Sequence, residues 1–230
     1  MEPVIRNLKT DGQYFEFTLQ GVNVAFANAI RRTIISEIPT VVFRTTPYEQ
    51  SRVTIHANTT RMNNELLKQR LSCIPIHIDD TSFPIDDYVV EINKQNESEV
   101  IEYVTTNDFR IRNIKNDKYL SEAENKRIFP VCSITGDYID FARLRPRVSD
   151  EIPGEELIMT CGLSIGTAKE DGAFNVASTC SYGATIDGVA ANAALTSRLN
   201  ELKTAGEDET SIDRFRKDWQ SLEAKRFIKK

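Results

Sequence analysis

The 230-residue sequence predicts an α+β protein, and three observations support this fold class. Residues 4–8 and 14–19 are strand-like segments on either side of an Asp11-Gly12 pair, which is a strong local signal for a β-hairpin. Residues 23–38 carry apolar side chains at spacings of three and four, the period of a helix. Residues 84–163 contain short strand-like segments separated by polar loops. A hairpin, helices and a mostly-β middle region therefore occur in one chain.

The predicted hairpin has one apolar face. In its second strand Phe15, Phe17 and Leu19 alternate with polar residues, so their side chains point to the same side of the sheet. An antiparallel sheet with one apolar face needs a covering layer. We expect the helix that follows to cover it.

That helix is predicted to begin after Asn23, which can cap its first turn, and to end before Pro39. Phe26, Ile30 and Ile34, with Thr33, form its apolar side. Arg31 and Arg32 lie on the other side, and guanidinium groups held by a packed helix are well-aimed donors for carbonyl, carboxylate or phosphate oxygens on a partner. A solvated pair of arginines is the alternative, because most charged helix faces are only exposed to water.

The rest of the chain is assigned in order. The segment 40–44 after Pro39 is a strand, 113–127 is an exposed loop, and 73–78, which contains Pro75, is an edge strand or an extended connector. Residues 174–185 are a strand that returns to the first sheet. Further strands are expected at 53–56, 88–92, 100–105, 109–114, 128–131, 138–141 and 157–163, and further helices at 62–71, 190–202 and 211–230.

Composition excludes several classes of protein. The net charge of −5 argues against a general nucleic-acid or anionic-membrane surface. The longest apolar stretches are too short to span a membrane, and the N-terminus does not resemble a signal peptide, so we expect a soluble intracellular protein. The four cysteines are scattered, which predicts neither a disulfide framework nor a zinc ribbon.

Residues suited to catalysis are few. His56 and His77 are the only histidines, and the Cys73–His77 spacing could supply at most half of a metal site. No phosphate-binding glycine pattern and no nucleophile motif is present. The sequence therefore predicts no catalytic residue, no metal and no cofactor.

Two motifs are more specific. Residues 23–43 read NVAFANAIRRTIISEIPTVVF, and residues 58–78 read NTTRMNNELLKQRLSCIPIHI. The first resembles the signature A-N-x-x-R-R followed by S/A-E-x-P-T of the RNA polymerase α-type subunit family, which comprises the bacterial α N-terminal domain, the archaeal D subunit and the third-largest subunit of eukaryotic RNA polymerase II. The second resembles that family's N-T-S…R-L-G-x-I-P-I segment, and residues 154–185 resemble the stretch that rejoins its dimerisation sheet.

The resemblance implies an architecture and a set of partners. The dimerisation domain would comprise residues 1–46 and 164–230, interrupted by a mostly-β insert domain at 47–163. Such a subunit is not an enzyme: it heterodimerises with a smaller α-like subunit and anchors the second-largest catalytic subunit of DNA-directed RNA polymerase. The largest subunit and a small zinc-binding subunit would complete its contacts, and DNA would be met only through the complex.

The resemblance also implies roles for individual residues. The apolar side of the first helix would meet the dimerisation partner, and the second-largest subunit would be held by the arginine pair. Two residues would fix the helix and its turn, and two more would face the large subunits. The residues of the apolar side are Phe26, Ile30 and Ile34, and the arginine pair is Arg31 and Arg32. Asn28 and Glu37 are the two that would fix the helix and its turn, and Glu65 and Arg70 are the two that would face the large subunits.

The sequence departs from the family pattern in three ways. It lacks the zinc cysteines of nuclear members, it has Ser72 where glycine is usual, and it ends at Lys230, before the family's last strand and long helix. We therefore expect either a truncated chain or a second polypeptide that completes the domain. The long charged segment at 186–230, the lack of zinc cysteines and the overall divergence are most similar to α-type subunits of large cytoplasmic DNA viruses. We expect an intracellular protein of the nucleus or cytoplasm, or of a viral factory or virion if the origin is viral.

Two other functions remain open. The chain could be a free-standing adaptor or regulator that has the α-type fold and binds a polymerase without being a core subunit. A small-molecule enzyme is disfavoured by the scarcity of histidines and nucleophile motifs.

Overall fold

The computed structural model describes residues 2–149 and 151–228. The chain divides into two compact units, residues 1–31 with 181–230, and residues 32–180. The predicted domains, 1–46 with 164–230 and 47–163, have other boundaries and stay a prediction.

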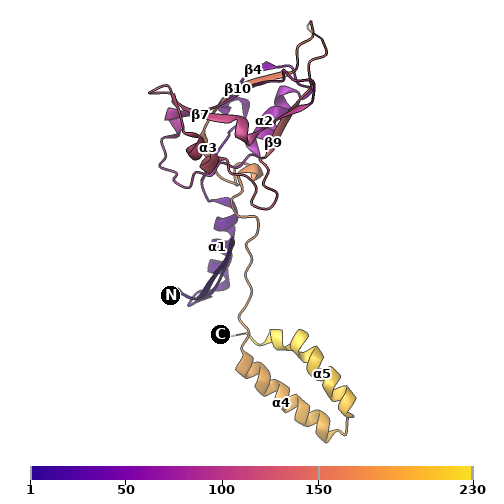
Figure 1. The fold of residues 1–230 in the computed structure, drawn as a ribbon. Coiled ribbons are helices and arrows are strands. Elements are labelled where there is room, and N and C mark those ends of the chain that lie inside the picture. The colour runs from indigo at the N-terminus through magenta and orange to yellow at the C-terminus, as the bar shows by residue number, and fades with distance from the viewer. Residues whose placement is uncertain (1, 150, 229–230) are drawn as a thin grey trace. The chain divides into compact units, whose positions relative to one another are not determined.

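The chain contains strands and helices that are largely segregated along the sequence, as expected for an α+β protein (Figure 1). The strands are β1 (Val4–Asp11), β2 (Tyr14–Gln20), β3 (Thr40–Val42), β4 (Val53–Asn58), β5 (Tyr88–Gln95), β6 (Glu102–Thr105), β7 (Phe109–Asn113), β8 (Lys118–Tyr119), β9 (Asp140–Leu144), β10 (Glu156–Gly162) and β11 (Ser164–Gly166). The α-helices are α1 (Val24–Ser36), α2 (Asn64–Ser72), α3 (Glu122–Ile128), α4 (Gly188–Thr204) and α5 (Glu209–Ser221). Short 3₁₀ turns are η1 (Tyr48–Gln50), η2 (Ile85–Asp87), η3 (Thr106–Asp108), η4 (Gly172–Phe174) and η5 (Glu223–Arg226).

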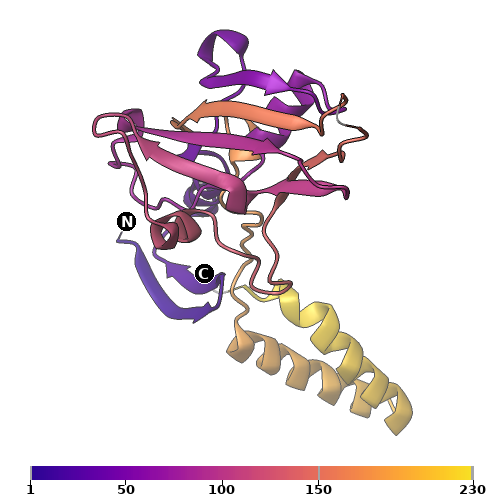
Figure 2. The same cartoon turned by 45° about the horizontal axis from the view of Figure 1, so that its top comes forward.

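The unit of residues 32–180 is built around a five-stranded antiparallel sheet in the order β4-β10-β5-β7-β8 (Figure 2). Two smaller antiparallel pairs, β6-β9 and β11-β3, complete its strands. In β10 the side chains of Leu157, Met159 and Cys161 are buried and alternate with less buried ones, as the period of two requires. The predicted mostly-β character of this part of the chain is confirmed.

Four phenylalanines form the centre of this unit's core. Phe109 packs edge-on against Phe43, Phe129 and Phe141, with ring centroids 6.4, 5.4 and 5.6 Å away. Edge-to-face packing aligns the positive ring edge with a negative face. Helix α2 adds Leu67 to this core, a residue with no exposed surface.

The stretch 113–127 is mostly exposed, as expected, but the prediction of a loop is wrong for much of its length. This stretch contains β8 and most of α3. The helix starts with a capping box, in which the Ser121 hydroxyl accepts from the Glu124 N–H and the Glu124 carboxylate accepts from the Ser121 N–H. The strand expected at 128–131 is also wrong, because Ile128 is the last residue of α3 and is buried as part of it.

Two predicted extended segments have different outcomes. Residues 73–78 form the extended connector, one of the two predicted alternatives, and not an edge strand. The side chains of Ile74 and Ile76 in this connector are buried. Residues 174–185 form no strand: Phe174 ends η4, and the chain runs on without regular pairing to an isolated bridge between Ile186 and Ile228. Phe174 is held by tertiary contacts and not by backbone hydrogen bonds to a neighbouring strand.

The C-terminal part of the other unit is a helical hairpin of α4 and α5. The side chain of Asp187 caps α4 by accepting from the N–H groups of Val189 and Ala190. The predicted stripe on α5 is partly confirmed, since Ile212 is buried but Leu222 is 68% exposed and follows the end of the helix. Among the residues described, no helix is both long and apolar enough to cross a membrane.

Candidate docking surface

The β1–β2 hairpin presents an apolar face. Its register pairs Ile5 with Leu19 and Thr10 with Phe15, and a bulge between Arg6 and Lys9 interrupts the ladder. Because side chains alternate across a strand, Phe15, Phe17 and Leu19 share one side of the sheet, together with Ile5. The Asp11-Gly12 turn is confirmed, and Gly12 has a φ of 57°, a conformation that favours glycine.

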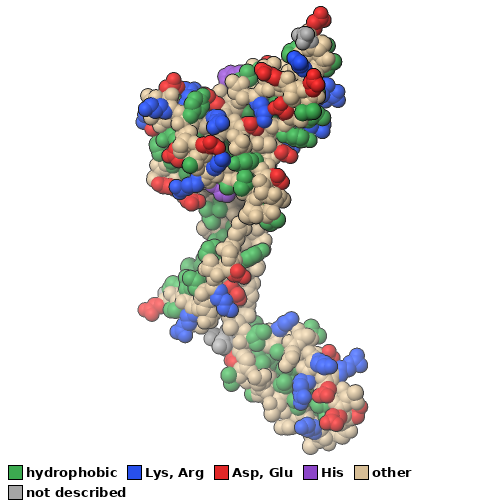
Figure 3. All heavy atoms as spheres, in the orientation of Figure 1, with side chains coloured by type: hydrophobic (Ala, Val, Ile, Leu, Met, Phe, Trp, Pro, Cys, Tyr) green, Lys and Arg blue, Asp and Glu red, His purple; other side chains and the backbone are tan. Residues whose placement is uncertain are grey.

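This apolar face is uncovered. No residue of β1 or β2 is buried, and Phe15, Phe17 and Ile5 are 70%, 41% and 60% exposed. The expectation that α1 buries this side of the hairpin is therefore wrong for the single chain. A two-stranded hairpin is only marginally stable in water without a layer packed against it. Figure 3 shows hydrophobic side chains on the surface of the segment that contains the hairpin and α1.

Helix α1 forms as the sequence predicts. The Asn23 side-chain oxygen accepts a 2.8 Å hydrogen bond from the Phe26 N–H, which caps the first turn. The Glu37 N–H donates to the Thr33 carbonyl at the other end, before Pro39. Yet the helix has no buried residue, and Phe26 on its apolar side is 46% exposed. Ile30 and Ile34 on the same side are half-buried.

The two arginines of α1 have different surroundings. The Arg31 Nε donates to the Asn28 side-chain oxygen at 3.0 Å, and Arg31 is half-buried. Arg32 is exposed, and no side chain among the described residues bonds to its guanidinium group. The Asn28 amide therefore orients one of the two guanidinium groups. Its predicted role in fixing the helix and its turn stays a prediction.

The C-terminal end of α1 is held by the loop that follows β11. The Lys169 N–H donates to the Ser36 carbonyl at 3.0 Å, and its ammonium group pairs with the Glu37 carboxylate at 3.1 Å. An orphan carbonyl of the last helical turn is thereby satisfied. Both members of the ion pair are exposed, so the charge interaction contributes little to stability and mainly positions the loop.

The two predicted residues of α2 also differ. Glu65 is exposed in the first turn, which begins with Asn63 as its cap, and a carboxylate there complements the helix dipole. Arg70 donates from Nε to the Phe141 carbonyl at 2.8 Å and from Nη2 to the Asp140 carbonyl at 2.9 Å. The guanidinium group therefore ties α2 to β9. Contacts of Glu65 and Arg70 with large subunits stay a prediction.

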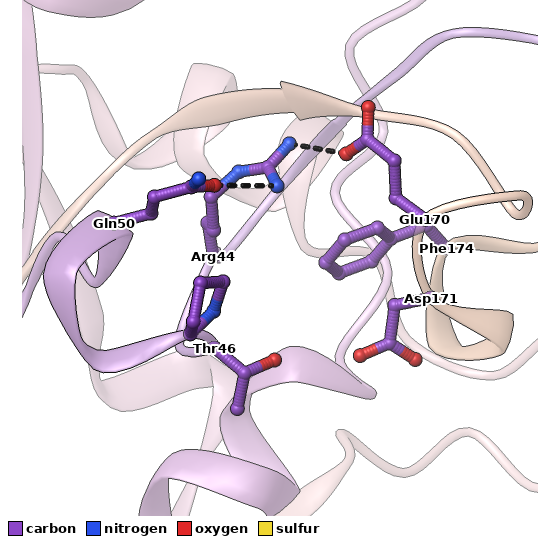
Figure 4. Close-up of a pocket in the computed structure, with 7 residues that line it drawn as sticks. Arg44, Thr46, Gln50, Glu170, Asp171 and Phe174 are labelled. Carbon is purple, nitrogen blue, oxygen red and sulfur yellow. Dashed lines mark hydrogen bonds and ion pairs between the residues drawn. The ribbon is translucent and has the colours of Figure 1, made fainter.

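Arg44 organises a site that the sequence did not reveal (Figure 4). Its guanidinium group donates to the Ser164 hydroxyl, the Ile165 carbonyl and the Glu170 carboxylate, and it lies 5.9 Å from the centroid of the Phe174 ring. The side chain is only 15% exposed. Local patterns did not indicate it, because Ser164, Ile165 and Glu170 are more than 100 positions away along the chain.

The residues considered for metal binding do not converge. Among the described residues, no group of three or more His, Cys, Asp or Glu side chains could hold a metal ion, and Cys73 and His77 are no exception. His56 instead bonds through Nε2 to the Thr160 hydroxyl at 2.8 Å on the neighbouring strand.

Two thiols have shifted pKa values for opposite reasons. Hydrogen bonds from the backbone N–H groups of Thr135 and Ile134 hold the pKa of the exposed Cys132 thiol below its usual range. Burial raises the pKa of the Cys161 thiol to about 12, since a thiolate would lose its hydration there. No histidine contributes to either shift.

Comparison with known proteins identifies the family. Residues 16–160 match the model of the RNA polymerase Rpb3/Rpb11 dimerisation domain. The chain belongs to this family. The matched residues include most of β2, α1 with its arginine pair, α2 and the five-stranded sheet up to residue 160 in β10. The two sequence motifs and most of the β-rich region therefore fall within one family match.

Curated members of the family show how far the similarity extends. Subunit Rpo3 of DNA-directed RNA polymerase from Pyrococcus horikoshii is 34% identical over 104 residues, 43% of this chain and 38% of that protein. Human subunit RPAC1 of DNA-directed RNA polymerases I and III is 28% identical over 195 residues, 75% of this chain and 51% of that protein. Subunit 3B of RNA polymerases IV and V from Arabidopsis thaliana is 42% identical over 72 residues, 31% of this chain and 20% of that protein. The chain thus spans between a fifth and about half of the length of these relatives.

Proposed function

We propose that this protein is a non-catalytic assembly subunit of a DNA-directed RNA polymerase. It heterodimerises with a smaller α-like subunit through the β1–β2 hairpin and the apolar side of α1. Its relatives are subunits Rpo3 and RPAC1 of such polymerases, and it carries the same dimerisation domain.

The single observation that carries this proposal is the uncovered apolar surface. β1, β2 and α1 contain no buried residue, although both the hairpin and the helix have one apolar side. Exposed apolar surface of this kind marks a protein–protein interface, and a partner with a similar hairpin and helix could cover both elements at once. We further propose that Phe26, Ile30 and Ile34 lie in that interface.

The arginine pair is proposed to anchor the second-largest subunit. Arg32 is exposed and Arg31 is directed by Asn28, so the two guanidinium groups offer donors for carboxylates or backbone carbonyls of that subunit. Glu65 is proposed to meet the large subunits. Arg70 is proposed to do so with the part of its guanidinium group that the β9 carbonyls leave exposed.

Other partners follow from the same assignment. In an assembled polymerase the largest subunit and a small zinc-binding subunit complete the surroundings of the chain, and DNA is met only through the complex. The protein then acts inside the cell, where polymerases work. The viral origin expected from the sequence stays a prediction, as does the polypeptide expected to complete the dimerisation domain.

A tagged full-length chain tests the assignment. A core subunit purifies from its own cells in stoichiometric amounts with two very large catalytic chains. A free-standing adaptor would instead purify with them in substoichiometric amounts, and turnover by the isolated chain on a small molecule would contradict the proposal altogether.

The role of the arginines is tested by Arg31→Ala combined with Arg32→Ala. The double variant is expected to fold and to retain the smaller partner while it loses the second-largest subunit. Arg61→Ala combined with Arg110→Ala is the matched control, because both residues are exposed and lie outside α1, in the loop before α2 and in β7. A double variant that unfolds, or that keeps the second-largest subunit as the control does, would refute this role.

A further inference from the structure

The direction of the arginine pair depends on how α1 is held. No residue of α1 is buried, so packing of its side chains holds the helix only weakly. Arg31 is oriented by Asn28 within the helix itself. Among the described residues no side chain bonds to the Arg32 guanidinium group, so its direction depends on the backbone of the last helical turn.

This last turn is bonded to the segment 167–174, which lies between β11 and the end of η4. The Ser36 hydroxyl donates to the Arg32 carbonyl at 2.8 Å, and the Ser36 carbonyl accepts from the Lys169 N–H at 3.0 Å. The Lys169 ammonium group also pairs with the Glu37 carboxylate at 3.1 Å. The position of the turn that carries Arg32 therefore depends on the position of Lys169.

Arg44 holds the segment 167–174 in place. It directly follows Phe43, which is fully buried in the core. Its guanidinium group donates to the Ile165 carbonyl at 2.8 Å, just before the segment, and to the Glu170 carboxylate at 2.5 Å, within it (Figure 4). It also lies 5.9 Å from the centroid of the Phe174 ring, where the segment ends. One planar group thus fixes the segment at its start, its middle and its end.

The bonds of Arg44 are the stronger part of this connection. The Arg44 side chain is 15% exposed, so its charge-assisted bonds are screened less than those of a surface pair. The side chains of Lys169 and Glu37 are 69% and 45% exposed, and an ion pair of this kind contributes little. Lysine could not replace Arg44, because a single ammonium group lacks the planar fork that reaches several acceptors at once.

We propose that Arg44 is a positioning residue for the docking of the second-largest subunit. It holds Glu170, and the neighbouring Lys169 then holds the last turn of α1. The backbone from which Arg32 projects is thereby fixed before the subunit binds, and a group that is already ordered loses less entropy on binding. The inference rests on the docking role proposed for the arginine pair.

Two variants and their controls test this role. Arg44→Lys keeps the charge and removes the fork. Arg112→Lys is its matched control, because Arg112 in β7 also bonds through several nitrogens, to Glu91 of β5 and to Asp117, and is 29% exposed. Glu170→Gln removes the charge of the bonded carboxylate and keeps an acceptor oxygen, and Glu91→Gln is its control.

Hydrogen exchange of the full chain, followed by NMR, tests the structural connection without any partner. In Arg44→Lys and Glu170→Gln the Lys169 amide is expected to exchange at least about five-fold faster than in the wild type, because its bond to α1 opens more often. Arg112→Lys and Glu91→Gln should leave the exchange of this amide unchanged. Equal exchange in the wild type and the two Arg44-site variants would overturn the proposal.

Calorimetric titration tests the role in docking. The full chain, bound to the smaller subunit that purifies with it, is titrated with the second-largest subunit, with and without the substitution Arg32→Ala. Arg44→Lys is expected to raise the Kd about five- to ten-fold when Arg32 is present and less than about three-fold when it is absent, because the group to be positioned is then missing. Glu170→Gln should act in the same direction, and Arg112→Lys should leave the Kd unchanged.

The outcomes separate this role from a purely structural one. Equal losses of affinity with and without Arg32 would show that Arg44 only stabilises the fold, and would overturn the proposal, as would no loss for Arg44→Lys and Glu170→Gln. If Arg44→Lys lowers the thermal midpoint, Glu170→Gln decides the result, because the Glu170 side chain is 47% exposed and its replacement does not disturb the core. A wild-type heterodimer that does not bind the second-largest subunit would refute the proposed function instead, and the exchange result would still judge the connection between Arg44 and α1.

Discussion

Replacement of Phe15 by alanine is expected to weaken the heterodimer while leaving the chain folded. Phe15 is 70% exposed, so about 140 Å² of a side chain of roughly 200 Å² is available for a partner to cover. At about 25 cal/mol per Å² this area corresponds to ~3.5 kcal/mol. Ordering and desolvation costs reduce that figure, and we expect a loss of about 2 kcal/mol, or roughly thirty-fold in Kd. Titration of the full chain with the smaller subunit that purifies with it, by calorimetry, measures the loss.

Tyr14→Ala is the control for this prediction. Tyr14 neighbours Phe15 in β2, is 80% exposed, and points to the other face of the hairpin because side chains alternate along a strand. Its replacement is expected to change the Kd less than about three-fold, as for a contact outside the interface core. Equal losses for Tyr14→Ala and Phe15→Ala, or no loss for Phe15→Ala, would refute the assignment of the apolar face as the interface. Thermal unfolding of both variants should match the wild type.

Three further predictions concern the unit of residues 32–180. Phe109→Ala removes a fully buried ring that contacts three other rings. Denaturant titration should show a free energy of unfolding lowered by about 3–5 kcal/mol. A loss under about 1 kcal/mol would contradict the packing described. Gly166→Ala would place a Cβ 2.7 Å from the Phe174 ring. The same titration should show a free energy of unfolding lowered by about 1–3 kcal/mol. An unchanged midpoint would show that the ring moves away freely. The lowered pKa of Cys132 means that, at neutral pH, more of this thiol is thiolate than of an ordinary cysteine, so iodoacetamide should modify it quickly. Cys161, with a pKa of about 12, should react only after unfolding. Mass spectrometry that finds the reverse order of modification would contradict both environments.

Local signals in the sequence were sufficient for α1 and the hairpin. The Asn23 cap, the Pro39 stop and the Asp11-Gly12 turn depend on neighbouring residues only, and all three are present in the structure. The alternation in β2 also indicated which face is apolar. What covers that face could not be derived from the same pattern, because an amphipathic segment is equally compatible with a helix of its own chain and with a partner.

The errors came from segments whose local signals conflict with their tertiary surroundings. The polar composition of 113–127 indicated a loop, but the Ser121–Glu124 capping box, which was available in the sequence, starts α3 there. The β-favouring composition of 174–185 indicated a strand, but no strand pairs with it among the described residues. The first error missed a local signal, whereas in the second segment tertiary context outweighs propensity.

The residues of the candidate site also differ in whether local sequence signals could indicate them. Arg31 and Arg32 were found by spacing on one helix, and their different surroundings follow from the nearby Asn28. Arg44 was missed because its partners Ser164 and Glu170 are distant in the sequence, and only the fold brings them together. Contacts of high sequence separation are those that local pattern reasoning cannot supply.

Hydrogen exchange of the full chain, alone and within the purified polymerase, tests the central claim most directly. Exposed backbone hydrogen bonds open readily, so the amides of β1, β2 and α1 should exchange quickly in the isolated chain. In the polymerase we predict strong protection of these three elements, with little change in the core strand β10, which is already buried. Equal exchange of β1, β2 and α1 in the two samples would contradict the claim that a partner subunit covers them.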